Sequence, residues 1–177
     1  MSTARGYLPS YTIDDYAQWQ GDWELWDGVP VAMTPSPFGP HQAASMRLAR
    51  QIGSQLDVCG CACEVLHEID WPISNNTVVR PDLVVGCDGV PERHLEAPPV
   101  LIAEILSAST EHKDRTAKYE LYESRAVQFY FLVDLVKLAV EAFFLDSGKY
   151  RSITSARTLE LELLPGCRIA ISPASIF

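Results

Sequence analysis

Two segments, VVRPDLVV (78–85) and VLIAEILS (100–107), decide the expected fold because each carries one carboxylate inside an otherwise apolar run. Runs of this length and composition are typical of central strands that are buried on both faces. An ionised carboxylate in such a strand is costly unless another group neutralises it. On neighbouring strands, Asp82 and Glu104 would also repel each other and raise each other's pKa. A divalent cation between them removes both costs, so the sequence predicts a metal site there.

The segments around these strands predict elements of both kinds. We expect helices over 12–20, from His41 to about Asp57, and from a cap at Ser109 or Thr110 to about Ser124. The expected strands are 23–26 and 29–33, joined by an Asp27-Gly28 turn, then 61–73, 78–85, 100–107, 127–134, 138–145, 149–153, 159–163 and 168–171. This order predicts one mixed α+β or α/β domain over residues 1–177.

The composition limits the partners of the chain. Its 177 residues, 47% of them hydrophobic, are enough to form a folded domain with a sizeable core. The net charge of −9 argues against broad electrostatic binding to DNA, although a local basic patch or an oligomer could still bind it. There is no apolar run of membrane-spanning length, and MSTARGYLPS lacks the apolar core of a signal peptide, so we expect a cytoplasmic protein with no membrane partner.

The five cysteines are an odd number, and three of them are close together. Cys59, Cys61 and Cys63 alternate, which would place all three on one face of a strand. Their spacing differs from the C-x₂-C of a zinc knuckle. Because we expect a reducing compartment, we favour reduced structural thiols over a metal or redox site.

Seven motifs follow one another along nearly the whole chain. They are WELWDG (23–28), SPFGPHQ (36–42), RPDLVV (80–85), AEILSAST (103–110), DRTAKYELY (114–122), VQFYFLVD (127–134) and ISPASIF (171–177). In this order and spacing they resemble the Uma2 (DUF820-type) family, a group of proposed endonucleases in the restriction-endonuclease-like PD-(D/E)XK superfamily. The resemblance implies a central mixed sheet of four or five strands, flanked by helices, with the site at one edge.

The resemblance also implies three catalytic residues. Pro81-Asp82 matches the PD element and Glu104 matches the acidic residue of the (D/E)XK element, but Leu106 stands at the lysine position. In this family the lysine lies in the following helix, where Lys118 matches it.

The spacing around Lys118 supports this assignment. Lys118 shares a helical face with Leu121, Tyr122 and Arg125, so its ammonium would point toward the interior, where a carboxylate pair could hold it. The alternative is a lysine whose ammonium reaches back to solvent.

Two further residues match family positions. His41 could be a ligand, a proton shuttle or a phosphate contact, or a helix-start residue with no role. Glu24 could belong to the site or face solvent from its strand. We expect no site role for His67, His94 and His112, and we expect Lys113 and Lys137 to be solvated surface lysines.

These residue types suit phosphodiester hydrolysis. Carboxylate oxygens favour Mg²⁺ or Mn²⁺, so Asp82 and Glu104 are the expected ligands, with the backbone carbonyl of Ile105 as a third candidate. Such an ion activates a bound water, while Lys118 orients that water or stabilises developing charge. We therefore expect a Mg²⁺-dependent endonuclease acting on DNA, in a homodimer or higher homo-oligomer. The alternatives are a noncatalytic homo-oligomeric or nucleic-acid-binding module with the same fold, and hydrolysis of RNA or a small phosphoester at the same site.

Overall fold

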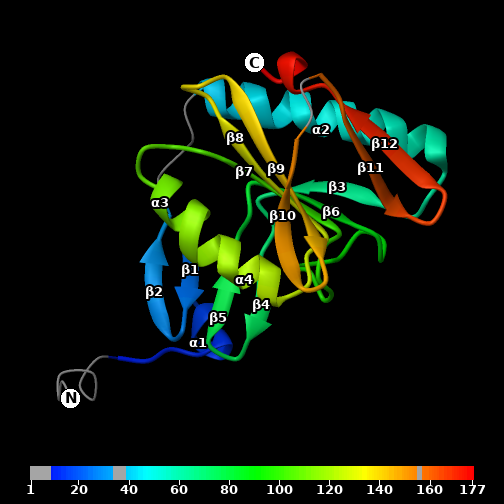
Figure 1. Cartoon of the computed structure of the whole chain (residues 1–177). Coiled ribbons are helices and arrows are strands. Elements are labelled where there is room, and N and C mark those ends of the chain that lie inside the picture. The colour runs from blue at the N-terminus through cyan, green and yellow to red at the C-terminus, as the bar shows by residue number, and fades with distance from the viewer. Residues whose placement is uncertain (1–8, 34–38, 155–156) are drawn as a thin grey trace.

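The computed structural model describes residues 9–33, 39–154 and 157–177, and two β-sheets form its framework (Figure 1). The larger sheet is mixed, with strand order β10-β9-β8-β7-β6-β3, and only its β7–β8 pair is parallel. Its strands are β3 (Glu64–His67), β6 (Leu83–Gly86), β7 (Leu101–Ile105), β8 (Phe129–Asp134), β9 (Ala139–Asp146) and β10 (Lys149–Ile153). The smaller sheet is antiparallel, with strand order β2-β1-β5-β4. Its strands are β1 (Trp23–Trp26), β2 (Val29–Ala32), β4 (Trp71–Ser74) and β5 (Thr77–Val79).

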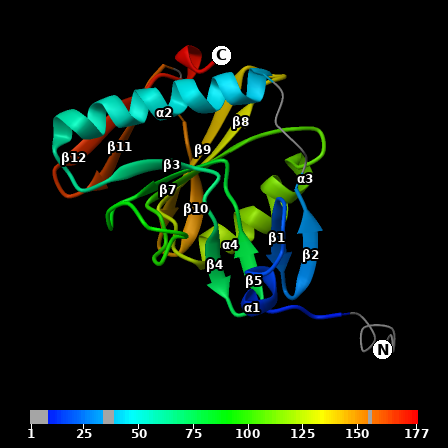
Figure 2. The ribbon, with the colours of Figure 1, turned by 180° about the vertical axis from the view of Figure 1, so that it is seen from behind.

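Helices and a separate hairpin pack around the two sheets, with the N-terminal helix beside the smaller sheet (Figure 1). They are α1 (Ile13–Tyr16), α2 (Gly39–Cys59), and a continuous helical segment made of α3 (Glu111–Lys113), the π-helical turn η2 (Asp114–Lys118) and α4 (Tyr119–Ser124). The hairpin consists of β11 (Leu159–Leu164) and β12 (Cys167–Ile171), and the 3₁₀ turn η3 (Pro173–Ser175) follows it. In both views, α2 and the hairpin lie away from the smaller sheet and from α3–α4 (Figure 2). None of the helices in the described ranges is long and apolar enough to cross a membrane.

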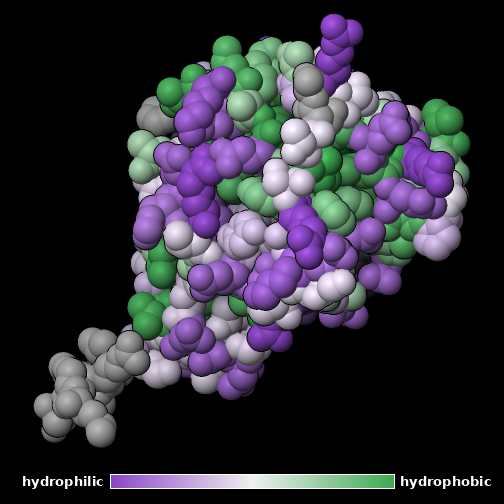
Figure 3. All heavy atoms as spheres, in the orientation of Figure 1, coloured by the Kyte–Doolittle hydropathy of each residue, from purple (hydrophilic) through white to green (hydrophobic). Residues whose placement is uncertain are grey.

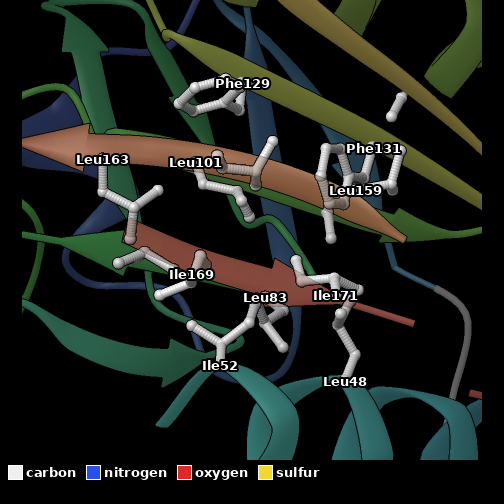
Figure 4. Close-up of a cluster of buried hydrophobic side chains, with 14 of the residues drawn as sticks. Leu48, Ile52, Leu83, Leu101, Phe129, Phe131, Leu159, Leu163, Ile169 and Ile171 are labelled. Carbon is white, nitrogen blue, oxygen red and sulfur yellow. The ribbon is translucent and has the colours of Figure 1, made fainter. Parts of the chain in front are cut away.

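One face of the larger sheet packs against α2 and the β11–β12 hairpin. Alternate residues of its strands, such as Leu83 and Leu101, belong to one buried cluster with Leu48 of α2 and Ile171 of β12. Figure 4 shows these side chains filling the space between the three elements.

The other face of the larger sheet packs against α4 and the smaller sheet. Val84 and Ile102 belong to a second buried cluster, with Tyr122 of α4. Because side chains alternate along a strand, Asp82 and Glu104 fall on this same face, two residues from Val84 and Ile102. The sheet thus places both carboxylates on the face that packs against α4.

The mixed α+β class is confirmed, but the expectation of a four- or five-stranded sheet is wrong, since the central sheet has six strands. Most expected elements are present, and α2 is longer at both ends than the expected helix. The Asp27-Gly28 turn has the positive φ angles, 47° and 80°, that a tight hairpin requires. Thr12 caps α1 through a capping box with Asp15, whereas Thr110 makes no capping hydrogen bond with its side chain.

Two expected strands are each broken, and this correction determines where the site lies. The strand over 61–73 breaks into β3 and β4 at Glu68, whose φ of 47° leaves the extended region. The strand over 78–85 breaks into β5 and β6 around Pro81, which has no N–H to donate to a sheet. Both breaks carry the chain from one sheet to the other, and they lie side by side because Glu68 N donates to the carbonyl oxygen of Asp82 at 3.3 Å.

The expectations for the cysteines need correction as well. Cys59 ends α2, and Cys61 and Cys63 lie in the connection to β3, so the three do not share a strand face. Cys63 forms a disulfide with Cys87, while Cys59, Cys61 and Cys167 are free. The disulfide contradicts the expectation of five reduced thiols and is more typical of an oxidising compartment.

The outer surface is mainly polar on the face seen in Figure 1. Hydrophilic side chains cover most of this face, and hydrophobic ones appear in small separate groups (Figure 3). Residues 36–38 of the SPFGPHQ motif lie outside the described residues.

Candidate active site

The carboxylate pair lies where the ladder between β6 and β7 ends. Leu83 pairs with Ala103, so the next position along each strand places Asp82 opposite Glu104 on the same face. Asp82 Oδ2 accepts a hydrogen bond from Ile105 N at 2.7 Å, which holds the connector against β7. The Asp82 side chain is 20% exposed, whereas Glu104 is only 2% exposed. One carboxylate therefore reaches the surface and the other lies in the core.

Lys118 is buried beside Glu104. Its Nζ lies 2.9 Å from Glu104 Oε1, 3.4 Å from Glu24 Oε1 and 3.6 Å from Asp114 Oδ1. The residue is 4% exposed, so its ammonium does not return to solvent. The apolar stripe of the helix correctly predicted this inward direction.

A π-helical turn presents Lys118 and Asp114 to the site. Both residues lie in η2, four positions apart, and both are buried. The hydroxyl of Tyr130 on β8 donates to the backbone carbonyl of Asp114 at 2.8 Å, which ties this turn to the sheet. Tyr122, one turn further on, donates to Glu104 Oε1 at 2.9 Å. Turns of this kind are frequent at functional sites.

Glu24 is an internal anchor for the lysines and does not face solvent. It is 0% exposed, and its Oε1 accepts a hydrogen bond from Arg80 N at 3.1 Å. Its Oε2 accepts from Trp26 Nε1 at 2.9 Å and from Lys113 Nζ. The expectation that Lys113 is a solvated surface lysine is therefore wrong. Lys137, by contrast, is 64% exposed as expected.

The buried charges set the protonation states of the cluster. Burial raises the pKa of Glu104 to about 8; Lys118 opposes this rise, and Asp114 and Asp82 add to it. Burial also opposes ionisation of Glu24, but Lys118 and Lys113 lower its pKa to about 2. Burial disfavours the charged form of Lys118, yet the surrounding carboxylates, Glu104 first, hold its pKa well above the ordinary value. The lysine thus stays charged and Glu104 takes up a proton near neutral pH, while burial also raises the pKa of Asp114.

His41 lies on the open side of Asp82. It belongs to the first turn of α2, and its Nε2 is 3.2 Å from Asp82 Oδ2. Burial disfavours the charged imidazole, but the hydrogen bond and charge of Asp82, the charge of Glu68 and the backbone of Ile105 together raise the pKa of His41. A cavity of about 470 Å³ opens here, lined by Asp22, Met33, His41, Gln42, Ser45, Met46, His67, Glu68, Arg80 and Asp82.

The donor set suits a hard divalent cation that retains several waters. Asp82, Glu104 and the Ile105 carbonyl offer oxygen ligands, and Mg²⁺ commonly takes only one or two carboxylates. Among described residues, Asp114 Oδ1 and His41 Nδ1 are buried without a hydrogen-bond partner, so Asp114 adds a carboxylate oxygen whose bonding is incomplete. Within the described ranges, these carboxylates do not form a cluster of three or more ligand atoms within 4.8 Å; such a cluster forms only from Cys59, Cys61 and Cys167.

Sequence reasoning missed several members of the site. Asp114 could have been found from its position four residues before Lys118, which puts both on one helical face. Arg80 lines the cavity and is held by Asp70 and Asp22, each at 2.7 Å, a contact between segments that no local pattern shows. His67, expected to have no site role, also lines the cavity, and its Nδ1 lies 3.0 Å from Ser45 Oγ.

Comparison with known proteins agrees with this architecture. The family model of Uma2, described as "Putative restriction endonuclease", matches residues 13–172. "Uncharacterized protein slr1290" of Synechocystis sp. is 28% identical over 166 residues, covering 88% of this chain and 86% of that protein. The crystal structure of "a putative nuclease belonging to DUF820" from Anabaena variabilis has the same fold, with a TM-score of 0.74 at 16% identity, over 94% of this chain and 97% of that one. Since the family match spans nearly the whole sequence, the chain belongs to the Uma2 family.

Proposed function

We propose that this chain is an endonuclease that hydrolyses phosphodiester bonds in DNA with the help of Mg²⁺ or Mn²⁺. The observation that carries the proposal is the buried contact between Lys118 and Glu104, directly opposite Asp82 at the edge of the cavity. The family description and the nuclease named among the structural neighbours support the same class of reaction.

The charge balance of the cluster supports binding of a divalent ion. Three carboxyl groups, those of Glu24, Glu104 and Asp114, pair with the ammonium groups of Lys118 and Lys113, and the charge of Asp82 also acts on Lys118. If all four ionise, four negative charges face the two ammonium groups and the protonated His41 beside Asp82, which leaves an excess of one negative charge. A divalent cation that replaces the proton of His41 and the proton of Glu104 would supply the positive charge that the ionised carboxylates need.

In this proposal, Asp82, Glu104 and the Ile105 carbonyl hold the ion, and Asp114 is a further candidate ligand. When bound, the ion would polarise a phosphoryl oxygen and lower the pKa of a water molecule. Lys118 holds Glu104 in place and offsets the negative charge that builds up during the reaction. Glu24 is a positioning residue, because it binds both Lys118 and Lys113.

His41 is the group placed to exchange a proton with a bound substrate. It lines the cavity, and Asp82 and Glu68 favour its protonated form. A protonated His41 can donate to a phosphate or a leaving oxygen there. It also contributes one positive charge beside Asp82 that a metal ion would replace.

A cleavage assay tests the proposal. Plasmid, single-stranded and branched DNA, with RNA in parallel, are incubated with the protein and Mg²⁺ or Mn²⁺. We expect metal-dependent cleavage of DNA by the parent and by Lys137→Ala, and none by Glu104→Gln. Cleavage of RNA alone would identify RNA as the substrate in place of DNA. Cleavage by the Glu104→Gln variant would contradict the assigned site.

The second candidate is a noncatalytic module that binds nucleic acid or a second copy of the chain. The near-complete burial of Glu104 and Lys118 and the net charge of −9 favour it. If the parent cleaves no nucleic acid with either ion, but binds DNA or sediments as a homo-oligomer, this function replaces the first.

A further inference from the structure

The three free cysteines come together on the side of the molecule where α2 ends. Cys59 is the last residue of α2, Cys61 follows in the connection to β3, and Cys167 begins β12. Their Sγ atoms all lie within 4.8 Å of one another, although Cys61 and Cys167 are 106 residues apart in sequence. Folding therefore gathers three thiols that the sequence leaves in two distant segments.

We propose that Cys59, Cys61 and Cys167 form a binding site for a thiophilic metal ion, with Zn²⁺ as its ligand. Zinc binds thiolates at about 2.3 Å, and tetrahedral geometry then separates the sulfur atoms by about 3.8 Å. The spacing of the three Sγ atoms is within small side-chain rotations of that value, and the closest pair, Cys61 and Cys167 at 2.8 Å, has to move apart. Cys167 is buried, while Cys59 and Cys61 are partly exposed, so a water molecule can reach a fourth position.

This site differs in chemistry from the carboxylate cluster. Thiolates select Zn²⁺ and other soft ions, whereas carboxylate and carbonyl oxygens select Mg²⁺ or Mn²⁺. Asp82 and Glu104 belong to the larger sheet and its connector, while the thiols belong to the end of α2 and to the hairpin. The two sites can therefore be loaded and tested separately.

A disulfide between Cys61 and Cys167 is the competing explanation of their short contact. It would use two sulfur atoms and leave Cys59 unexplained, although Cys59 interacts with both of the others. Cys63 and Cys87 already pair with each other, so a second disulfide would have to form with an added oxidant. A ligand that needs three sulfur atoms accounts for the whole cluster.

The position of the cluster indicates a structural role for the metal. The end of α2 is joined to β12 by the side chain of Gln55, which accepts from Ala170 N at 2.7 Å and donates to Ala170 O at 2.9 Å. Gln51 likewise accepts from Ser172 N at 2.9 Å. A metal ion held by Cys59, Cys61 and Cys167 would cross-link the same two elements and stabilise the folded chain through its binding energy.

Cobalt titration of the full chain, prepared free of metal and without reductant, tests this inference. We expect one equivalent of Co²⁺ to produce thiolate-to-metal charge-transfer absorption, which Zn²⁺ then displaces. Cys167→Ser should lose this absorption. Cys59→Ser should lose it too, and because Cys59 is more exposed than Cys167, its replacement disturbs folding less. Zn²⁺ should raise the melting temperature of the parent and leave that of both variants unchanged.

Two matched controls separate this site from its neighbours. Asp82→Asn should keep the charge-transfer absorption, because it alters only the carboxylate cluster. The double variant Cys63→Ser/Cys87→Ser should also keep it, because it alters only the disulfide. Absorption that survives in both Cys59→Ser and Cys167→Ser would overturn the proposal. A second disulfide in the parent would also overturn the proposal. It would be identified by three results together: no charge-transfer absorption, one titratable thiol, and a mass two hydrogens lower than that of the chain with one disulfide.

Discussion

Replacing Glu104 by glutamine should change how the stability of the metal-free protein depends on pH. Burial raises the pKa of Glu104 from 4.5 to about 8. A carboxyl group with a raised pKa in the folded state contributes its full stability below the unfolded value, and this contribution is lost as pH rises through the folded value. The window is therefore about pH 4.5 to 8. At about 1.4 kcal/mol for each pKa unit, the loss at the top of this window is at most about 5 kcal/mol.

Glutamine isolates this effect because it resembles the protonated carboxyl group. It keeps an oxygen that can accept from Lys118 and Tyr122, and it cannot ionise. The free energies of unfolding of the variant and the parent should differ by less than about 1 kcal/mol near pH 5, because pH 5 is only half a unit above the unfolded pKa of 4.5. Near pH 9 the variant should be the more stable by a few kcal/mol, up to the limit of about 5 kcal/mol.

Urea unfolding followed by tryptophan fluorescence, with a chelator present at pH 5, 7 and 9, measures the difference. Glu160→Gln, at an exposed position of β11, is the matched control, and its free energy of unfolding should follow that of the parent at all three pH values. If Glu104→Gln is less stable than the parent at pH 9, Lys118 stabilises an ionised Glu104 more than burial destabilises it. That result would refute the protonation state assigned to the site.

Three further predictions concern the other members of the site. Asp82→Asn should reduce the heat of Mn²⁺ binding in calorimetry, and equal heats for variant and parent would remove Asp82 from the ligand set. Lys118→Ala should lower the free energy of unfolding by about 3–5 kcal/mol, because it leaves buried carboxylates without their counter-charge. It should also lower the cleavage rate by about 10²–10³-fold. Lys137→Ala should change neither quantity, and a fully active Lys118→Ala would show that the lysine has no part in the reaction. His41 has a raised pKa, so its contribution to stability is lost as pH rises above about 6.5, and His41→Gln should remove that loss in pH-dependent melting curves.

Local patterns predicted the types of the elements better than their partners. Alternation and β-branched residues correctly identified the strands around Val84 and Ile102, and the apolar stripe around Lys118 predicted its inward direction. The break at Pro81 separates strands of two different sheets, and hydrophobicity does not distinguish those sheets because both sides of the break are buried. Pro81 itself was the available signal, since proline has no N–H for a ladder.

Contacts between segments that are distant in the sequence account for most of the other differences between the expected and the observed structure. Lys113 looks like a surface lysine in a polar stretch, and its partner Glu24 is 89 residues away. Cys167 is likewise separated from Cys61 by 106 residues. Glu68 adopts a positive φ without being glycine, which only the surrounding structure can impose. In each case the deciding energy comes from a tertiary neighbour that sequence spacing does not reveal.

The break at Pro81 has a mechanical consequence for the candidate site. Asp82 lies in the connector between the two sheets, whereas Glu104 belongs to β7 of the larger one. The hydrogen bond from Ile105 N to Asp82 Oδ2 at 2.7 Å therefore fixes the separation of the two carboxylates across the boundary between the sheets. Arg80, just before Pro81, forms ion pairs with Asp22 and Asp70, which lie on the segments that lead into β1 and β4. The geometry available to an ion thus depends on ion pairs and hydrogen bonds that hold the boundary between the two sheets, as well as on the ligands themselves.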